Sequence, residues 1–354
     1  MPAVSLLDDA RPLFETPPPA VTEDEAAALV AEHYGVSGAV RRLTGERDAN
    51  FVLTSADGSA VVFKVINPLE PDAEAEMQAQ VLNALAAQAG PLTLPTARRT
   101  KDGAMILRTR TASGLSVRAR CYTYLPGEPL SVRPVDDLQR RAVGRTAGEV
   151  TRALSGFDHP AARRLNLWDL CKIGALLPLV DGLPPSVTRD QVATFLDHFI
   201  TAVSPRIAGL RHQVIHNDLS RSNLLFPPGF TGGLLSVVDF GDMIHAPLLS
   251  ELAVAASYQI AGEDPLWNLR VVAAAFDAVM PLLPEECDLL LDFVLARLMG
   301  RILITRWRAD LFPDNSAYIL RSSQEAQTLL NTLYPVWKNR AAINWTAFYR
   351  GEEE

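Results

Sequence analysis

Two acidic turns hold the residues of this sequence whose types and spacing are best suited to chemistry. The first contains His216, Asp218 and Asn223, and the second begins at Asp239. A short apolar run, of the kind that forms a buried strand, precedes each turn. Asp218 and Asn223 are five residues apart, which is too far for one helical turn but suits a loop that presents a carboxylate and an amide oxygen to one small volume.

The chemistry that these oxygen atoms suit is phosphoryl transfer. A hard cation such as Mg²⁺ takes oxygen ligands from one or two protein groups and completes its octahedron with phosphate and water. Asn223 and Asp239 are the candidate metal ligands. Asp218 is then left to orient an attacking hydroxyl group and to accept its proton. We therefore expect an enzyme that uses a nucleotide.

The two turns resemble those of a known family. His216, Asp218 and Asn223 match the H-x-D-x-x-x-x-N loop of the aminoglycoside phosphotransferase and choline kinase superfamily, and residues 239–241 match its Asp-Phe-Gly-like metal-binding turn. The combination is most similar to the hydroxylysine kinase-like branch, and the resemblance covers about residues 40–252. It implies an α+β, bilobal, protein kinase-like fold. It also implies that His216 supports the loop and is not the base, while Asn217 replaces a glycine often found there.

The expected small lobe combines helices with an antiparallel sheet of about five strands. Thr22 and Glu25 form a capping-box pattern before an alanine-rich helix that ends near Gly35. A second helix is expected over residues 72–89. Alternating apolar residues predict strands over residues 40–43, 50–55, 60–66, 104–109 and 115–124, with a hairpin turn at 56–59.

Lys64 lies inside the apolar strand 61–65, where an unpaired ammonium group would be costly to desolvate. The resemblance implies that this lysine binds nucleotide phosphates and is braced by a helix glutamate. The next helix offers Glu74 and Glu76, and Glu76 best resembles the family position. The alternative is an edge-strand lysine that reaches solvent. In the polar turn 44–50, Asp48 and Asn50 are candidate nucleotide contacts together with Gly45, and an ordinary polar hairpin is the alternative.

A hinge is expected near residues 122–127, where backbone groups of Thr123 and Leu125 would contact the nucleotide base. The lobe boundary is therefore placed at Leu125. The predicted organisation is a flexible, proline-rich arm over 1–20, a nucleotide-binding lobe over 21–125, and a helical lobe over 126–354 that carries the catalytic loop and acceptor pocket. Helices are predicted at 135–154, 189–210, 249–261, 266–280, 284–308 and 322–336, and a proline- and glycine-rich loop at 178–185.

Three residues are candidates for the acceptor pocket. Asp169 would meet a cationic amine and Trp168 would stack on it; a helix N-cap beside a core tryptophan is the alternative. Asp242 either joins this pocket or braces the metal turn. Arg301 is an alternative recognition group, as are Arg306 and Trp307, and all three also suit surface or interhelical pairs.

The composition of the 354-residue chain excludes several classes of function. Its formal net charge of -8 argues against a nucleic-acid-binding surface. The three widely spaced cysteines suggest neither a disulfide framework nor a zinc site. No apolar run reaches the roughly 18–20 residues that span a bilayer, and the N-terminus does not resemble a signal peptide. We expect a cytoplasmic monomer or homodimer with no membrane partner.

The sequence thus predicts ATP-dependent phosphorylation of a hydroxyl group on a small molecule, with Mg²⁺ as cofactor. The expected acceptor is an amino alcohol or a hydroxylated amino acid, whose amine would make it a candidate for recognition as a cation. Hydroxylysine, ethanolamine-like alcohols, homoserine and aminoglycosides all stay open, as does GTP as the donor. The alternatives are an aminoglycoside-type phosphotransferase, a catalytically silent kinase-fold module, and a nucleotidyl or other transferase with a reversed nucleotide.

Overall fold

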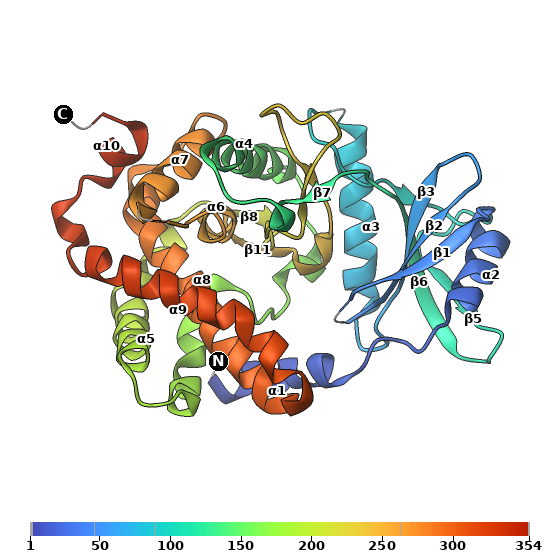
Figure 1. Ribbon diagram of the computed structural model, residues 1–354, viewed down its shortest axis with the longest axis horizontal. Coiled ribbons are helices and arrows are strands. Elements are labelled where there is room, and N and C mark those ends of the chain that lie inside the picture. Colours follow the sequence, from blue (N-terminus) through green and yellow to red (C-terminus); the bar gives the residue numbers. More distant parts are fainter. Residues whose placement is uncertain (1–2, 46, 89, 263, 353–354) are drawn as a thin grey trace.

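The computed structural model describes residues 3–45, 47–88, 90–262 and 264–352 of the chain. An antiparallel sheet with two helices forms a small lobe beside a larger helical lobe (Figure 1). The strand order is β1-β2-β3-β6-β4, and β5 also pairs with β6. The strands are β1 (Ala39–Leu43), β2 (Ala49–Thr54), β3 (Ala60–Val65), β4 (Ala97–Arg98), β5 (Leu107–Arg110) and β6 (Ser116–Thr123). The two-residue β4 is the one strand of this sheet that the sequence pattern missed.

Strand alternation separates the apolar core of this lobe from its charged face. Phe63 is fully buried with Val61 and Val65 in the core beneath α2 (Glu23–Tyr34). Because successive side chains point to opposite faces, Lys64 faces the other side, with Asn50 and Arg120 as its cross-strand neighbours. Helix α3 (Asp72–Ala87) lies on that side, between the sheet and the helical lobe (Figure 1).

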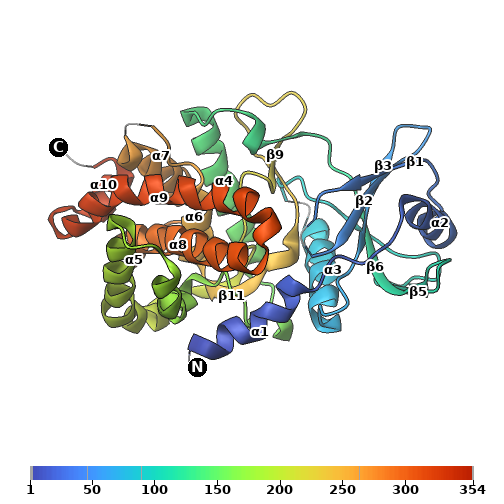
Figure 2. The same cartoon turned by 60° about the horizontal axis from the view of Figure 1, so that its bottom comes forward.

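The helix start predicted at Thr22 and Glu25 is confirmed, with both capping-box hydrogen bonds present and Gly35 ending α2 at φ 70°. The proline-rich arm is helical over most of its described part and has no regular structure only over residues 16–20. Residues 3–15 form helix α1, with Pro12 inside it, and α1 lies against the helical lobe (Figure 2). The buried Leu6 joins the core of that lobe, so tertiary packing outweighs the hydrogen bond that Pro12 removes.

Seven α-helices of the described chain build the large lobe. Helix α6 is buried along its whole length, and Gly144 lets α7 approach α4 closely, since a Cβ atom there would lie 2.2 Å from the carbonyl oxygen of Val272. The helices are α4 (Asp137–Leu154), α5 (Val187–His198), α6 (Leu248–Ser257), α7 (Pro265–Asp277), α8 (Pro284–Leu311), α9 (Ser316–Lys338) and α10 (Trp345–Arg350).

Two predictions for this lobe are wrong in detail. The sequence predicts a single helix over 189–210, but the α-helical part ends at His198. A π-helical turn follows, and then a 3₁₀-helix over Ser204–Gly209. Pro205 explains the change, because it has no N–H group to continue the α-helical ladder. The loop expected at 178–185 is largely a long 3₁₀-helix, Leu170–Gly182.

Short strands hold the two acidic turns in place. Strand β8 (His212–Ile215) pairs with β11 (Ile244–Pro247), while β9 (Leu224–Phe226) lies between β10 (Ser236–Val237) and β7 (Glu128–Pro129). The first acidic turn therefore connects β8 to β9, and the second connects β10 to β11. Pairing of these strands brings both turns to one edge. Across the described ranges, no helix is both long enough and apolar enough to cross a membrane.

Candidate functional site

The structure brings Lys64, Asp218, Asn223 and Asp239 into one connected network. The Lys64 Nζ atom lies 3.2 Å from Asp239 Oδ1. The Asn223 side-chain amide donates to Asp218 Oδ2 at 2.6 Å. The backbone carbonyl of Asn223 accepts a hydrogen bond from Val238 N at 3.0 Å, directly before Asp239. The small lobe thus contributes a cation to two loops of the large lobe.

Both loops contain a residue with a left-handed backbone. Asn217 has φ 66° and Asp239 has φ 61°, and these are the two non-glycine residues with positive φ in the part of the chain that the structure describes. Asparagine and aspartate tolerate this region better than most residues. A residue that replaces glycine at position 217 must adopt this conformation, which explains why asparagine is suitable there.

Glu251 on α6 holds the first loop from below. It is fully buried, and its two carboxylate oxygens accept hydrogen bonds from the backbone N–H groups of Asn217 at 2.8 Å and His216 at 3.3 Å. Burial raises the pKa of Glu251 to about 8, and the two backbone bonds oppose this shift. The sequence pattern did not single out this contact, because α6 follows the loop by more than thirty residues.

His216 supports the loop through both ring nitrogens. Its Nε2 lies 3.1 Å from the carbonyl oxygen of Val238, so Nε2 carries the proton, and its Nδ1 accepts from Asp218 N at 3.3 Å. The ring packs edge-on against Phe240, with the centroids 4.6 Å apart. Burial lowers the pKa of His216, which favours the neutral form. These contacts agree with a supporting role.

Asp218 has the electrostatics of a candidate base. Burial raises the pKa of Asp218 to about 7, although the Arg297 guanidinium, 3.1 Å away, lowers it. Its side chain is 24% exposed, so a substrate hydroxyl can reach it. At neutral pH a substantial fraction of such a carboxyl group is ionised and able to accept a proton.

Lys64 pairs with acids other than the one predicted. Burial opposes the charge of Lys64, but Asp239 and Asp48, whose Oδ2 is 3.6 Å from Nζ, raise its pKa. The expected brace Glu76 instead points to solvent on α3 and lies 3.7 Å from Arg108. The prediction of a Lys64–Glu76 pair is wrong, because Glu76 is half-exposed beside Arg108 while Asp239 and Asp48 are the acids paired with Lys64.

A different glutamate of α3 is connected to the site. Glu74 forms an ion pair with Arg164, whose Nη2 donates to the carbonyl oxygen of Gly241 at 2.6 Å and whose Nε donates to that of Met243 at 3.2 Å. Arg164 therefore ties α3 to the second acidic turn. The sequence offered Glu74 only as a second possible brace for Lys64, and it gave no signal for Arg164.

The polar turn 44–50 reaches the site through residues of its second half. Asp48 accepts a hydrogen bond from Asn67 N at 2.9 Å while facing Lys64. The side-chain oxygen of Asn50 is buried without a hydrogen-bond partner among the described residues. Arg47 pairs with Asp242 at 3.3 Å across the two lobes. Nucleotide contact by Asp48 and Asn50 stays a prediction, and Glu46 lies outside the described residues.

The hinge residues are only partly free for a nucleotide base. The backbone N–H of Thr123 donates to the carbonyl oxygen of Thr96 at 3.0 Å, and the Thr123 hydroxyl accepts from Thr96 N at 2.8 Å. Its N–H group is thus already used within the sheet. Leu125 follows, half-buried, on the connection to β7. Its contact with a nucleotide and the lobe boundary there stay predictions.

Of the three predicted acceptor-pocket residues, one lies beside Asp218. Trp168 contacts the Arg297 guanidinium, 4.6 Å from the ring centroid. Asp169 instead accepts a hydrogen bond from Cys171 N at 2.9 Å and caps the 3₁₀-helix, and burial raises its pKa. Asp242 accepts from Arg47 and, at 3.3 Å, from Asn166, so it braces the metal turn. These contacts are the ones that the alternative interpretations expect, and a role of Asp169 or Asp242 in the acceptor pocket stays a prediction.

The donor set at the turns fits a cation that needs few protein ligands. The Asn223 Nδ2 atom points to Asp218, which leaves its amide oxygen for a metal. Asp239 has one oxygen on Lys64 and the Gly241 N–H, and its side chain is 48% exposed. Within the described ranges no cluster of three or more His, Cys, Asp or Glu residues suits a metal ion. One carboxylate and one amide suffice for Mg²⁺ when phosphate and water complete the shell.

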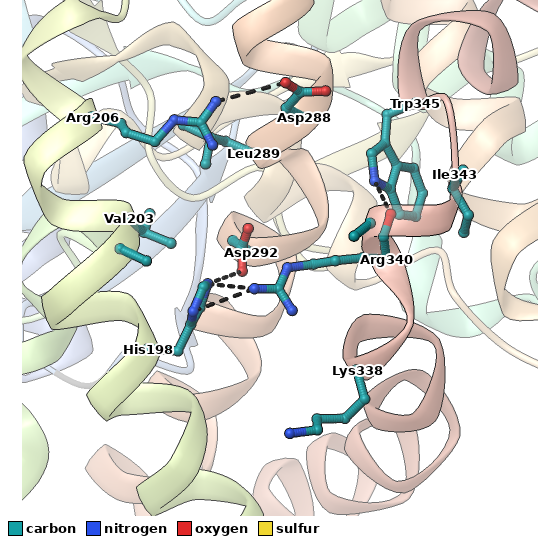
Figure 3. Close-up of a pocket in the computed structure, with 12 residues that line it drawn as sticks. His198, Val203, Arg206, Asp288, Leu289, Asp292, Lys338, Arg340, Ile343 and Trp345 are labelled. Atoms are coloured by element: carbon teal, nitrogen blue, oxygen red, sulfur yellow. Dashed lines mark hydrogen bonds and ion pairs between the residues drawn. The ribbon is translucent and has the colours of Figure 1, made fainter.

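A separate cavity of about 400 Å³ lies in the helical lobe, between α5, α8 and the C-terminal segment. His198, Asp292 and Arg340 point toward one another in its wall (Figure 3). None of the residues that line it belongs to the network around Asp218. This cavity is therefore not the candidate site.

Comparisons with known proteins show which family model and which folds are similar to this chain. The model of the phosphotransferase enzyme family (APH) matches residues 39–287. Mouse hydroxylysine kinase is 25% identical over 351 residues, covering 92% of this chain and 93% of the relative. A microcompartment-associated aminopropanol kinase has a TM-score of 0.63 at 16% identity, covering 87% and 96% of the two chains. An amicoumacin kinase with bound AMP-PNP and Ca²⁺ has a TM-score of 0.64 at 15% identity, covering 91% and 96%. The predicted kinase-like fold is confirmed.

Proposed function

Because the chain belongs to the phosphotransferase enzyme family, we propose that it transfers the γ-phosphoryl group of ATP to a hydroxyl group of a small molecule. One observation carries the proposal. Lys64, Asp218, Asn223 and Asp239, which are far apart in the sequence, form a single network between the two lobes. Each has the chemical type that phosphoryl transfer requires.

Asp218 orients the acceptor hydroxyl and takes its proton. The hydroxyl oxygen forms a bond to the γ-phosphorus, and the bond from that phosphorus to the β,γ-bridging oxygen breaks. The products are the phosphorylated acceptor and ADP, and the proton is on Asp218. A pKa of about 7 makes Asp218 a stronger base than an ordinary carboxylate, and a substantial fraction of it is still ionised near neutral pH.

Lys64 holds the phosphates of the nucleotide. Its ammonium group pairs with Asp239 of the large lobe and with Asp48 of the small lobe, which places a positive charge next to the candidate metal ligands. Asn223 and Asp239 would hold Mg²⁺, which supplies neutralisation of the phosphate charge when bound. An AMP-PNP complex of a similar fold supports an adenine nucleotide as donor, and GTP is the alternative.

The proposed acceptor is an amino alcohol or a hydroxylated amino acid. The resemblance in sequence to mouse hydroxylysine kinase over nearly the whole chain supports a hydroxylated amino acid. The resemblance in structure to an aminopropanol kinase supports an amino alcohol. Both classes carry a hydroxyl and an amine, so a panel built on these two groups is the appropriate first screen.

The test is ADP release from purified protein, Mg·ATP and that panel. We expect at least one acceptor to be phosphorylated, and Asp218→Asn to reduce turnover by about 10²- to 10⁴-fold while still binding nucleotide. Asp288→Asn is the matched control, because Asp288 is a half-exposed carboxylate of α8 outside the network. No ADP release with any acceptor, together with no effect of Mg·ATP on the melting temperature, would favour a catalytically silent module.

A further inference from the structure

Arg297 of α8 is a buried guanidinium with unused hydrogen-bonding capacity beside the candidate base. Its side chain is 3% exposed. One nitrogen, Nη2, donates to Asp218 Oδ1 at 3.1 Å and to the Tyr258 hydroxyl at 2.9 Å. Its Nε and Nη1 are buried and have no hydrogen-bond partner among the described residues. Leaving charged donors buried and unpaired is costly, so the site is arranged as if another anion belongs there.

Aromatic rings hold this guanidinium in place. Its carbon lies 4.6 Å from the centroid of Trp168 and 5.6 Å from that of Tyr258. Both rings are only partly buried, so they reach the solvent side of the site next to Asp218. A guanidinium fixed against aromatic faces is preorganised to bind a planar carboxylate.

A second arginine of α8 differs from Arg297 in its hydrogen bonds. Arg301, four residues along α8, also packs on Tyr258, at 4.8 Å. Its nitrogens already donate to Ser322 and, at 3.0 Å, to Glu325. Among the described residues, Asp218 is the one carboxylate within ion-pair distance of Arg297, and that carboxylate has its own role in the proposed reaction.

We propose that Arg297 recognises a carboxylate group of the acceptor, so that the substrate is a hydroxylated amino acid and not a simple amino alcohol or a polycationic aminoglycoside. This rests on the proposed kinase function. A carboxylate provides the planar pair of oxygens that guanidinium N–H groups bind best. A second carboxylate would also share the positive charge of Arg297, which now interacts with Asp218 Oδ1, leaving that oxygen freer to receive the hydroxyl proton.

The acidic residues near the site do not favour a polycationic acceptor. The carboxylate predicted to meet an amine, Asp169, accepts a hydrogen bond from Cys171 N, and the other candidate pocket carboxylate, Asp242, is bonded to Arg47 and Asn166. A polycation would therefore face Arg297 without those compensating charges. A single amine and one carboxylate on the same molecule match the charges better.

The experiment compares acceptors that differ only in the carboxylate. Three pairs are suitable: hydroxylysine with 1,5-diaminopentan-2-ol, homoserine with 3-aminopropan-1-ol, and serine with ethanolamine. For a pair that is turned over, we expect wild-type kcat/KM to favour the amino acid by about 10- to 100-fold, the range for a charge-assisted hydrogen bond. Arg297→Gln should reduce that preference to about threefold or less, mainly through KM, and Arg297→Lys should retain part of it.

Arg301→Gln is the matched control and should keep the wild-type preference, because its partners lie on α9. A purely structural role for Arg297 would lower kcat/KM equally for both members of a pair. Equal wild-type kcat/KM values, or an unchanged preference in Arg297→Gln, would overturn the inference while leaving the kinase proposal intact. If Arg297→Gln does not fold, the wild-type comparison and Arg297→Lys decide. Failure of every acceptor would overturn both proposals.

Discussion

Lys64 and Asp239 form an ion pair at 3.2 Å, although 175 residues separate them in the chain. The pair joins β3 of the sheet lobe to the turn that carries a candidate metal ligand. It places the phosphate-binding cation and the metal site in one small volume before any nucleotide arrives. Substituting each partner separately would distinguish the role of the cation from the role of the metal ligand.

Lys64→Met should weaken use of the nucleotide. Removing the ammonium group leaves Asp239 and Asp48 facing each other without their shared cation and takes a positive charge from the phosphates. We expect kcat/KM for ATP to fall on the order of 10²-fold or more. Lys101→Met, on the surface beside Ala31, is the control. Equal kinetics in the two variants would contradict the role of Lys64.

Activity should depend on the ionisation of Asp218. The pKa of this carboxyl is raised to about 7, so the base is protonated and inactive at low pH. We expect kcat/KM for the acceptor to rise about tenfold per pH unit below 7 and to level off above it. Arg297→Gln removes a cation that lowers this pKa, so the rising limb should move to higher pH. A limb centred near pH 4 in the wild type would argue against Asp218 as the base.

Glu251 should make the stability of the fold pH-dependent. Its folded-state pKa of about 8 lies above the ordinary value of 4.5. The folded protein therefore binds more protons than the unfolded chain between these values, and this contribution is complete at low pH and is lost as pH rises toward 8. Glu251→Gln should flatten the fall in melting temperature from pH 5 to pH 8.

The same substitution should weaken the catalytic loop at every pH. Glutamine offers one oxygen to two backbone N–H groups, so at pH 5 we expect a loss of about 1–3 kcal/mol in the free energy of unfolding. Chemical denaturation measures this loss. A variant as stable as the wild type at pH 5 and equally sensitive to pH would show that Glu251 does not hold the loop as described.

Arg164 should couple α3 to the metal turn. Arg164→Ala leaves the partly buried Glu74 without its cation and frees two carbonyl oxygens, so we expect a loss of about 2–3 kcal/mol in the free energy of unfolding. The neighbouring Arg163 is half-exposed and pairs with Asp158 at the surface. Arg163→Ala should cost about 1 kcal/mol or less, and denaturant titrations of the two variants provide the comparison.

Turnover should require a divalent cation held through Asn223. Chelation with EDTA is expected to stop ADP release, and added Mg²⁺ to restore it. Asn223→Ala removes one of two protein oxygen ligands, so the Mg²⁺ concentration for half-maximal rate should rise about tenfold or more. Ser222→Ala, one position earlier, is the control and should leave that concentration nearly unchanged. An unaltered Mg²⁺ requirement in Asn223→Ala would remove it from the metal site.

Local patterns were sufficient where the determining physics is local. Strand alternation placed Lys64 and Phe63 on opposite faces of the sheet, and the Thr22–Glu25 pair marked the start of a helix. The spacing from Asp218 to Asn223 indicated the loop in which these two side chains form a hydrogen bond. These features depend on side-chain period, backbone hydrogen bonding and separations of a few residues. They could therefore be predicted without knowing the rest of the fold.

The sequence by itself determined which chemical groups the site contains and the class of fold that carries them. Only the tertiary structure decided their partners: Asp48 in place of Glu76 for Lys64, Arg164 for Glu74, and Arg297 for Asp218. Arg297 and Asp218 are 79 residues apart. An arginine on a long helix has no local signal for the carboxylate it will meet, because helix packing and strand register set which face it occupies.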